Sequence, residues 1–387
     1  MKIKHKFEII VIITLLIISV ITVSIVSSHH YDSNEVRVKN FFAEKKNNLD
    51  VVHIGASEIY AGFSPEYIWH NYGITSYNLA TSAAPLGLFK SQVKSVRKRQ
   101  NPKLIVISLN GVMYGNKKSK EEGFIRLWLD NMPEGKIRHE AIDDLIEENK
   151  LTYRFKFLKY HDNIGDLNKS LKMTWKNLKS IQDKRFLTIR SVQGLATTDD
   201  RNLAEIINVK QYKKEKSLSD EAQKRLSELL DYLKNENITN VIFVNMPRYY
   251  NSKMLWTKEK INYAKRIVQE HGFEVYDFDD YVDVIGLDPK EDFYNIPHLN
   301  IRGQQKMSKY FYDYIAPKYN INVSHTGEEV DRWNENYEIY LKLTQWVEHI
   351  MTTYPERKIE YNYKVVDHIL EGTIAEYEEE LLKNKGN

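Results

Sequence analysis

The sequence predicts an α/β protein in which a doubly wound parallel sheet is flanked by helices. Short apolar runs alternate with stretches of helical periodicity, an order typical of parallel strands joined by right-handed crossovers. The run at 104–109 is continuously apolar, as in a strand buried on both faces. The predicted strands are 49–54, 104–109, 241–245 and 273–277.

Helices are predicted between and after these strands from apolar residues at helical spacing. One covers 89–100, and the last helix of the unit covers 301–315. Ser219 and Thr257 are expected to cap two further helices, and Asn300 is expected to cap the last one, because short polar side chains bind the free N–H groups of a first turn.

The chain divides into four predicted parts. Residues 1–28 form a membrane anchor or signal segment, and the polar residues 29–48 form a linker. An α/β domain follows at 49–320, interrupted by a charged, aromatic stretch at about 112–216 that is too long for a plain loop and is expected to be a helical insertion or lid. Residues 321–387 are expected to form a C-terminal helical hairpin.

The N-terminus indicates attachment to the cell membrane. A basic segment at 1–6 precedes the uncharged, apolar run 9–26, a pattern typical of a signal peptide or a single anchor. Since no Ala-x-Ala cleavage site follows, an uncleaved anchor is predicted. The N-terminal lysines would then stay in the cytoplasm, and the rest of the chain would lie outside the membrane.

Composition excludes several classes of function. The formal charge of +3 over 387 residues, without a concentrated basic stripe, argues against nucleic-acid binding. The absence of cysteine removes thiol catalysis, disulfides and thiolate metal sites. The histidines lack the carboxylate or histidine partners of a metal centre, so no metal is predicted.

A serine and a histidine carry the predicted chemistry. Ser57 follows Gly55 at the end of the first strand, where open α/β sheets place reactive groups. His298 lies in a turn after Pro297, just ahead of the last helix, and could return to the same sheet edge as the base for Ser57. A serine at this place also occurs as a plain helix cap, so position alone does not decide the role.

Two blocks resemble the SGNH (GDSL-like) hydrolase superfamily. The segment 55–57 resembles its first block, which supplies the nucleophile, and 295–298 resembles its last block, normally Asp-x-x-His. The wider run 292–303 resembles the extracytoplasmic, membrane-anchored branch, which includes alginate-type O-acetylation proteins and the D-alanine transfer protein of teichoic-acid decoration. The resemblance extends over about 49–315 and implies an SGNH, flavodoxin-like fold.

The resemblance implies that Ser57 is the nucleophile and His298 the general base. Asn295 occupies the position of the usual aspartate that orients the imidazole, and an amide there contributes less to stabilising the imidazolium. Asp292, three residues earlier, is an alternative orienting group.

The same resemblance implies a set of oxyanion donors. They are the backbone of Ser57, the segment around Asn78 in place of the second block, and Asn110, which follows the second predicted strand. The glycine of the second block and the Gly-x-Asn-Asp of the third have no equivalent in this chain.

The function expected from the resemblance is that of a cell-surface acyl or acetyl transferase, or the corresponding esterase. It would act on a glycan or cell-wall polymer through a covalent acyl-serine, receive its acyl group near a membrane acyltransferase partner, and need no cofactor. The alternative is a non-catalytic SGNH-like binding or assembly subunit of a surface-polymer modification complex.

Overall fold

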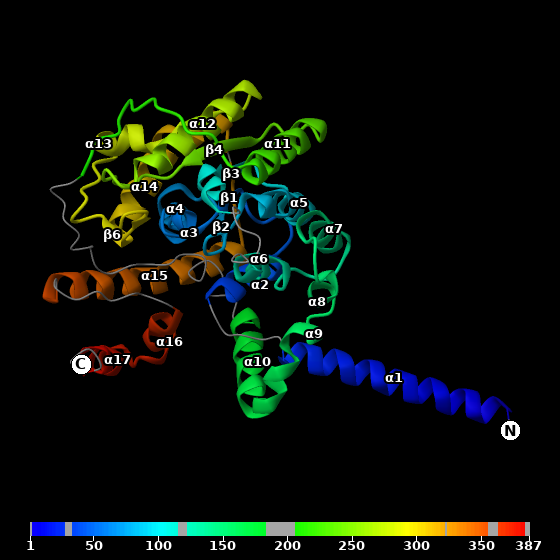
Figure 1. Ribbon diagram of the computed structural model, residues 1–387. Coiled ribbons are helices and arrows are strands. Elements are labelled where there is room, and N and C mark those ends of the chain that lie inside the picture. The colour runs from blue at the N-terminus through cyan, green and yellow to red at the C-terminus, as the bar shows by residue number, and fades with distance from the viewer. Residues whose placement is uncertain are drawn as a thin grey trace.

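The centre of the protein is a five-stranded parallel sheet with the order β2-β1-β3-β4-β5 (Figure 1). The computed structural model describes residues 2–27, 33–114, 122–182, 206–321, 323–354 and 363–383. The strands are β1 (Val51–Gly55), β2 (Ser76–Ala80), β3 (Leu104–Ser108), β4 (Val241–Asn245) and β5 (Val275–Asp277).

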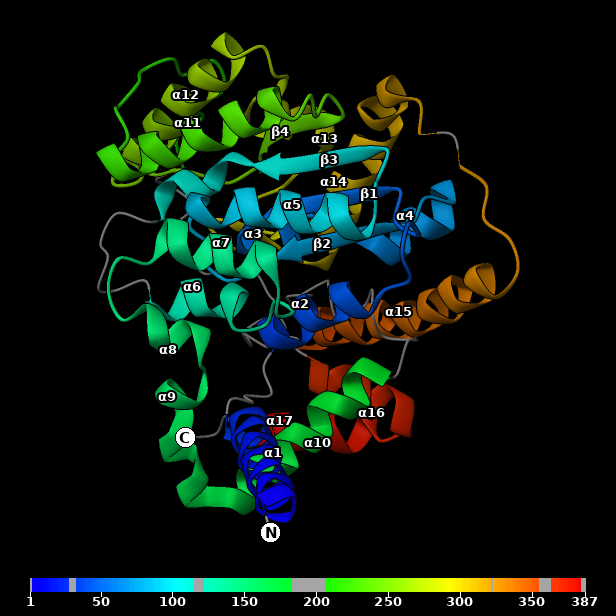
Figure 2. The same ribbon diagram turned by 90° about the vertical axis from the view of Figure 1, so that its right-hand side faces the viewer.

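Helices cover both faces of this sheet (Figure 2). Successive side chains of a strand point to opposite faces, and here they enter two separate cores: Val52 and Ile54 lie in one, Val51 in the other. The first core is completed by α5 (Phe89–Arg99), α11 (Asp220–Asn235) and α12 (Leu255–Glu270). The second is completed by α3 (Ser57–Tyr60), α4 (Pro65–Tyr72), α13 (Val282–Ile285) and α14 (Ile301–Tyr314).

The α/β prediction is therefore confirmed, and the strand order agrees with a doubly wound sheet of the 2-1-3-4-5 type. Such a sheet changes winding direction between β1 and β3, and ligands bind outside the carboxyl ends of the strands at that point. The four predicted strands exist. The sequence reading missed β2 and the small hairpin described below.

Two of the three predicted helix caps are confirmed. The Ser219 hydroxyl accepts the Ala222 N–H at 3.3 Å, and the Asn300 side chain accepts two N–H groups of the first turn of α14. The Thr257 prediction is wrong: α12 begins at Leu255, and the Thr257 hydroxyl donates to the Met254 carbonyl at 2.7 Å from within the first turn.

The segment predicted as a polar linker, 29–48, contains the helix α2 (Ser33–Ala43), which is packed into the domain. Val36, Val38 and Phe41 are fully buried. Its charged residues Glu35 and Arg37 are buried as well, and the Arg37 guanidinium donates to the Ala80 carbonyl at 3.2 Å. The described part of this segment therefore belongs to the globular domain.

The insertion is helical where the structure describes it, as predicted. Its residues 115–121 and 183–205 lie outside the described ranges. The helices are α6 (Glu122–Leu129), α7 (Lys136–Leu145), α8 (Lys150–Arg154), α9 (Phe157–Tyr160) and α10 (Leu167–Gln182), with a 3₁₀ segment, His161–Asp166, before α10.

Helix α1 (Lys2–Ser27) projects from the rest of the protein (Figure 1). Among the described helices it is the one that is long and apolar enough to cross a membrane; its segment His5–Val26 has a mean hydropathy of 3.2 and is exposed. This agrees with a single N-terminal anchor. The side of the membrane on which the domain lies stays a prediction.

The C-terminal part forms three helices where two were predicted: α15 (Glu328–Thr353), α16 (Tyr363–Glu371) and α17 (Ile374–Lys383). They enclose a third small core that includes Trp346, Val347 and Val366. Residues 355–362, within the predicted hairpin, lie outside the described ranges.

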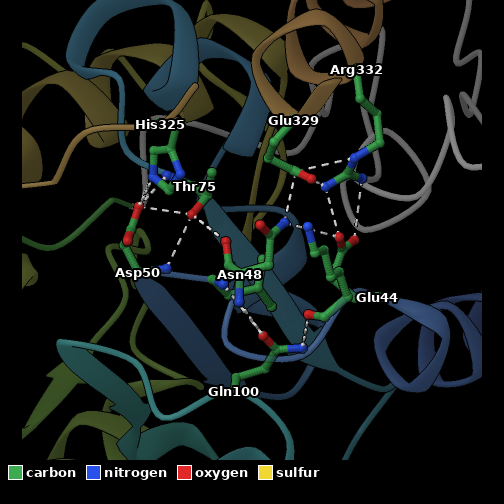
Figure 3. A network of polar contacts seen from close by, with 10 residues as sticks. Glu44, Asn48, Asp50, Thr75, Gln100, His325, Glu329 and Arg332 are labelled. Carbon is green, nitrogen blue, oxygen red and sulfur yellow. Dashed lines mark hydrogen bonds and ion pairs between the residues drawn. The ribbon is translucent and has the colours of Figure 1, made fainter. Parts of the chain in front are cut away.

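A polar network joins this C-terminal part to the amino-terminal edge of the sheet (Figure 3). Arg332 donates to Glu44 at 2.6 Å, and Asn48 donates to Glu329 at 2.7 Å. Nearby, the His325 imidazole lies 2.8 Å from an Asp50 carboxylate oxygen. Since this edge is opposite the carboxyl ends of the strands, the network has a structural role.

Candidate active site

The turn between β1 and α3 places Ser57 at the carboxyl edge of the sheet. A Cβ atom on Gly55 would lie 2.4 Å from the Ile59 side chain and 2.8 Å from that of Ser108, so the turn requires glycine. The helix begins directly at Ser57, and the side chain of Ser57 is 8% exposed.

His298 reaches the same edge on a short antiparallel hairpin, β6 (Phe293–Asn295) and β7 (His298–Leu299). The hairpin packs closely on the first turn of α14, where a Cβ on Gly303 would lie 2.2 Å from the Asp292 carbonyl. The Asn300 N–H donates to that same carbonyl at 2.9 Å. Gly303 and Asn300 together fix the position of the histidine.

The two predicted residues meet in the structure: the Ser57 Oγ and His298 Nε2 atoms are 2.7 Å apart. In the neutral tautomer with its proton on Nδ1, the imidazole accepts a hydrogen bond from the serine hydroxyl at this distance. This is the arrangement in which a histidine can remove the proton of an attacking serine.

The surroundings keep the imidazole unprotonated at neutral pH. Burial, with a further contribution from the positive charge of Arg248, lowers the pKa of His298 to about 4. An ordinary histidine titrates near 6.5, so this one remains able to accept a proton well into the acidic range.

Arg248 is a site residue that sequence reasoning missed. It follows β4, is 9% exposed, and its Nε atom has no hydrogen-bond partner in the described part of the chain. Its charge acts on both His298 and Glu58. No local motif marks it; the available signal was its place three residues beyond the last residue of a buried strand.

A buried cluster of charges holds the loop that carries Arg248. The Arg248 N–H donates to an Asp279 oxygen at 3.1 Å. The Lys258 ammonium lies 2.8 Å from Asp277 and 3.0 Å from Asp279, and all three side chains are almost fully buried. The hydroxyl of Tyr250 donates to Asp279 at 2.7 Å. The arginine is therefore set on a rigid part of the domain.

Glu58, the residue after Ser57, holds the serine turn. One of its carboxylate oxygens accepts the Ala56 N–H at 3.1 Å and the Ser108 hydroxyl at 2.7 Å. Burial raises the pKa of the Glu58 carboxyl. These bonds tie the ends of β1 and β3 together beneath Ser57.

Asn295, predicted to orient the imidazole, lies directly opposite His298 in the hairpin. Its side-chain oxygen is buried and has no hydrogen-bond partner in the described part of the chain. Asp292, the alternative orienting group, binds elsewhere: one carboxylate oxygen accepts from Lys306 and from the Asp288 N–H, both at 2.7 Å. These bonds hold the fold of the hairpin, and the other Asp292 oxygen is buried without a hydrogen-bond partner in the described part of the chain.

The two predicted oxyanion asparagines have different positions. Asn78 is fully buried in β2, where its amide bonds to His53 at 2.9 Å and to the Phe63 carbonyl at 2.8 Å; its side chain therefore serves the core, and a donor from the segment around it would have to be a backbone N–H. Asn110 lies just beyond β3, is buried, and its side-chain amide has no partner among the described residues. A free amide donor at this edge suits an oxyanion.

A cavity of about 460 Å³ lies between the insertion and the sheet domain. Its lining includes Leu86, Ile125, Tyr153 and Arg225, and also Tyr114. Burial and the negative charge of Glu58 raise the pKa of Tyr114 to about 12, so this tyrosine lies near the serine turn. Neither Ser57 nor His298 is among the residues that line the cavity.

Metal ligands do not gather at this site or elsewhere: in the described ranges, no group of three or more histidine or acidic side chains could hold a metal ion. Comparison with protein-family models gives no match to this chain. Comparison with curated proteins gives none either.

Proposed function

We propose that the protein is a membrane-anchored serine enzyme of the SGNH type, with its domain outside the membrane, that transfers or hydrolyses an acyl group. The observation that carries the proposal is the 2.7 Å contact between the Ser57 hydroxyl and an unprotonated His298 at the carboxyl edge of the sheet. The substrate class that we propose is an acyl or acetyl ester on a glycan or cell-wall polymer.

In the first step His298 Nε2 takes the proton of Ser57, and the serine oxygen bonds to the acyl carbon. The bond from that carbon to the leaving group then breaks, and His298 returns the proton to the leaving group. In the second step an acceptor hydroxyl or water gives its proton to His298, and its oxygen bonds to the acyl carbon. The bond from that carbon to the Ser57 oxygen then breaks, and His298 returns the proton to the serine oxygen, which restores the free serine. No cofactor is needed.

Two groups are placed to stabilise the negative charge that forms on the acyl oxygen in each step. The free amide of Asn110 is a neutral donor at this edge, and Arg248 supplies a buried positive charge. Hydrogen-bond donors fixed in advance around a developing oxyanion are a large contribution in acyl transfer.

The anchor and the cavity support the choice of substrate. Helix α1 would hold the enzyme at the membrane, where a membrane acyltransferase could supply the acyl group. The cavity of about 460 Å³ between the insertion and the sheet domain is large enough for part of a sugar chain.

One observation favours a second candidate function, that of a non-catalytic binding or assembly subunit of a polymer-modification complex. In the described structure no carboxylate is hydrogen-bonded to His298, and Asn295 stands unbonded in the expected aspartate position. An imidazolium without that support is less stable during attack.

A fluorophosphonate probe separates the two functions. The full chain in detergent is treated with the probe, and intact mass is measured for wild type, Ser57→Ala and His298→Ala, with Ser227→Ala on the exposed surface of α11 as the matched control. An adduct that the first two substitutions abolish and the third retains supports the enzyme. An unmodified wild type, with native folding shown by its thermal unfolding, refutes the reactive serine and favours the binding subunit.

A further inference from the structure

The insertion exposes an unusual amount of apolar surface. Outside α1, most of the exposed large apolar side chains in the described part of the chain lie between residues 151 and 178. Phe155 is 60% exposed, Ile164 40% and Trp175 71%. Contiguous apolar surface of this kind marks a place where a protein meets another apolar phase or a partner.

Helix α10 buries polar side chains and exposes apolar ones, whereas a helix packed on a water-soluble domain buries its apolar side chains. Ser170 and Thr174 are its buried side chains. Leu167, Leu171, Trp175 and Leu178 are all exposed, and their spacing of four, four and three residues places them in one stripe along the helix. We call these four residues the apolar stripe.

Exposed lysines flank the apolar stripe. Lys169, Lys172, Lys176 and Lys179 are exposed on the same helix, interleaved with the stripe in sequence. A helix with leucine and tryptophan on one side and lysines beside them is typical of segments that lie in the plane of a membrane interface. The long lysine side chains reach out to the headgroups while their stems cover apolar surface.

The position of α10 in the fold brings the stripe to the membrane. Helices α9 and α10 and the 3₁₀ segment between them contact α1. Among the residues of α1 whose burial is described, 5–26, partial burial occurs only near the C-terminal end, at Val23, Ser24 and Val26. This is the end where the chain leaves the membrane span. Helix α10 crosses α1 there instead of running along it (Figure 1), as a helix lying flat on the bilayer would.

We propose that α10, with the neighbouring α9 and 3₁₀ segment, lies on the surface of the lipid bilayer around α1. The apolar stripe enters the boundary between headgroups and acyl chains, to a depth of about 5–10 Å. The flanking lysines face anionic lipid headgroups. The insertion thereby acts as a second membrane contact beside the anchor.

This contact would fix the orientation of the site relative to the membrane. Helix α10 also contacts α2, and α2 contacts β2. From α2, the Arg37 guanidinium lies 4.0 Å from the centre of the Tyr60 ring in α3, the helix that begins at Ser57. The path from the bilayer to the serine therefore runs through packed elements.

Depth-dependent quenching tests the proposal. Because the chain has no cysteine, single cysteines can carry an environment-sensitive fluorophore at Leu171→Cys and Trp175→Cys. The matched control is Trp256→Cys, which replaces another exposed tryptophan, on α12. The full chain is reconstituted in phosphatidylcholine bilayers with and without phosphatidylglycerol. Quenching is measured with nitroxide-labelled lipid and with aqueous iodide.

The labels at positions 171 and 175 are expected to emit at shorter wavelength, to be quenched by the nitroxide lipid and to resist quenching by iodide. The control label at position 256 is expected to be quenched by iodide and not by the nitroxide lipid. Replacing Lys169, Lys172 and Lys179 by glutamine should increase iodide access in the phosphatidylglycerol bilayers alone. The proposal is overturned if Trp175→Cys is as open to iodide as the control. It is also overturned if that label resists both quenchers, because a protein surface or a second copy would then cover the stripe.

Discussion

The position opposite His298 offers the sharpest test of how the imidazole is controlled. Asn295 and His298 are a directly opposed cross-strand pair, and such pairs have Cβ atoms about 4.5–5.5 Å apart with both side chains on one face. Asn295→Asp therefore introduces a negative charge close to the imidazole, at a place where the asparagine oxygen has no partner in the described structure.

The expected shift follows from the distance. An opposite charge within about 4–6 Å changes a pKa by about 1–3 pH units toward the charged form. The pKa of His298, lowered to about 4 mainly by burial, should then rise to about 5–7 in the variant. At pH 5 this would reduce the unprotonated fraction several-fold, while the plateau rate at higher pH should rise because the imidazolium gains a counter-charge.

The assay is the rate of fluorophosphonate labelling of Ser57 as a function of pH, followed by intact mass on the full chain. The control is Asp292→Asn, which should lower stability without moving the pH midpoint, because the Lys306 ammonium loses its buried counter-charge. A midpoint in Asn295→Asp equal to that of wild type would refute the reasoning, since the side chain at 295 would then not face the imidazole.

Three further predictions follow from the site. Arg248→Gln removes a charge that lowers the pKa of His298, so the labelling midpoint should move to higher pH; an unchanged midpoint would contradict the role of this arginine. Burial lowers the pKa of His298 to about 4 in the folded state, so between about pH 6.5 and 4 the unfolded chain binds more protons than the folded one. The free energy of unfolding should therefore decrease as pH falls through this range. His298→Gln removes the titrating group and should flatten the urea-unfolding pH profile between about pH 6.5 and 4. Lys258→Met leaves Asp279 buried without its lysine partner and Asp277 with only Lys265, 3.3 Å away, and should cost about 3–5 kcal/mol in urea unfolding; a cost near zero would show that these aspartates are solvated.

The strands that the sequence predicted are those whose residues are apolar without interruption or nearly so, such as β3 and β4. Strand β2 was missed because it includes Ser76 and Asn78, polar residues that the fold buries. The helix α2 was read as linker for the same reason. Arg37 can be buried because the Ala80 carbonyl accepts a hydrogen bond from it. This partner lies 43 residues along the chain, so the local sequence around Arg37 does not indicate it.

The candidate site divides along the same line. Ser57 and His298 could be found because each lies at the end of a recognisable local pattern, a strand-to-helix turn and a capped helix. The place of Arg248 and the burial of the Asn78 side chain could not be predicted, because each depends on a partner in a distant segment. Arg248 is held by Asp279, and Asn78 is bonded to His53.

The network in Figure 3 has a consequence for the order in which the chain folds. Burial raises the pKa of Glu44 even with Arg332 beside it, so this carboxyl depends on its arginine partner. Arg332 is 288 residues further along the chain, and at roughly 5–20 residues per second it is synthesised about 15–60 s later. The first residues of the domain therefore wait for Arg332, and the amino-terminal edge of the sheet is sealed only after all five strands have been synthesised.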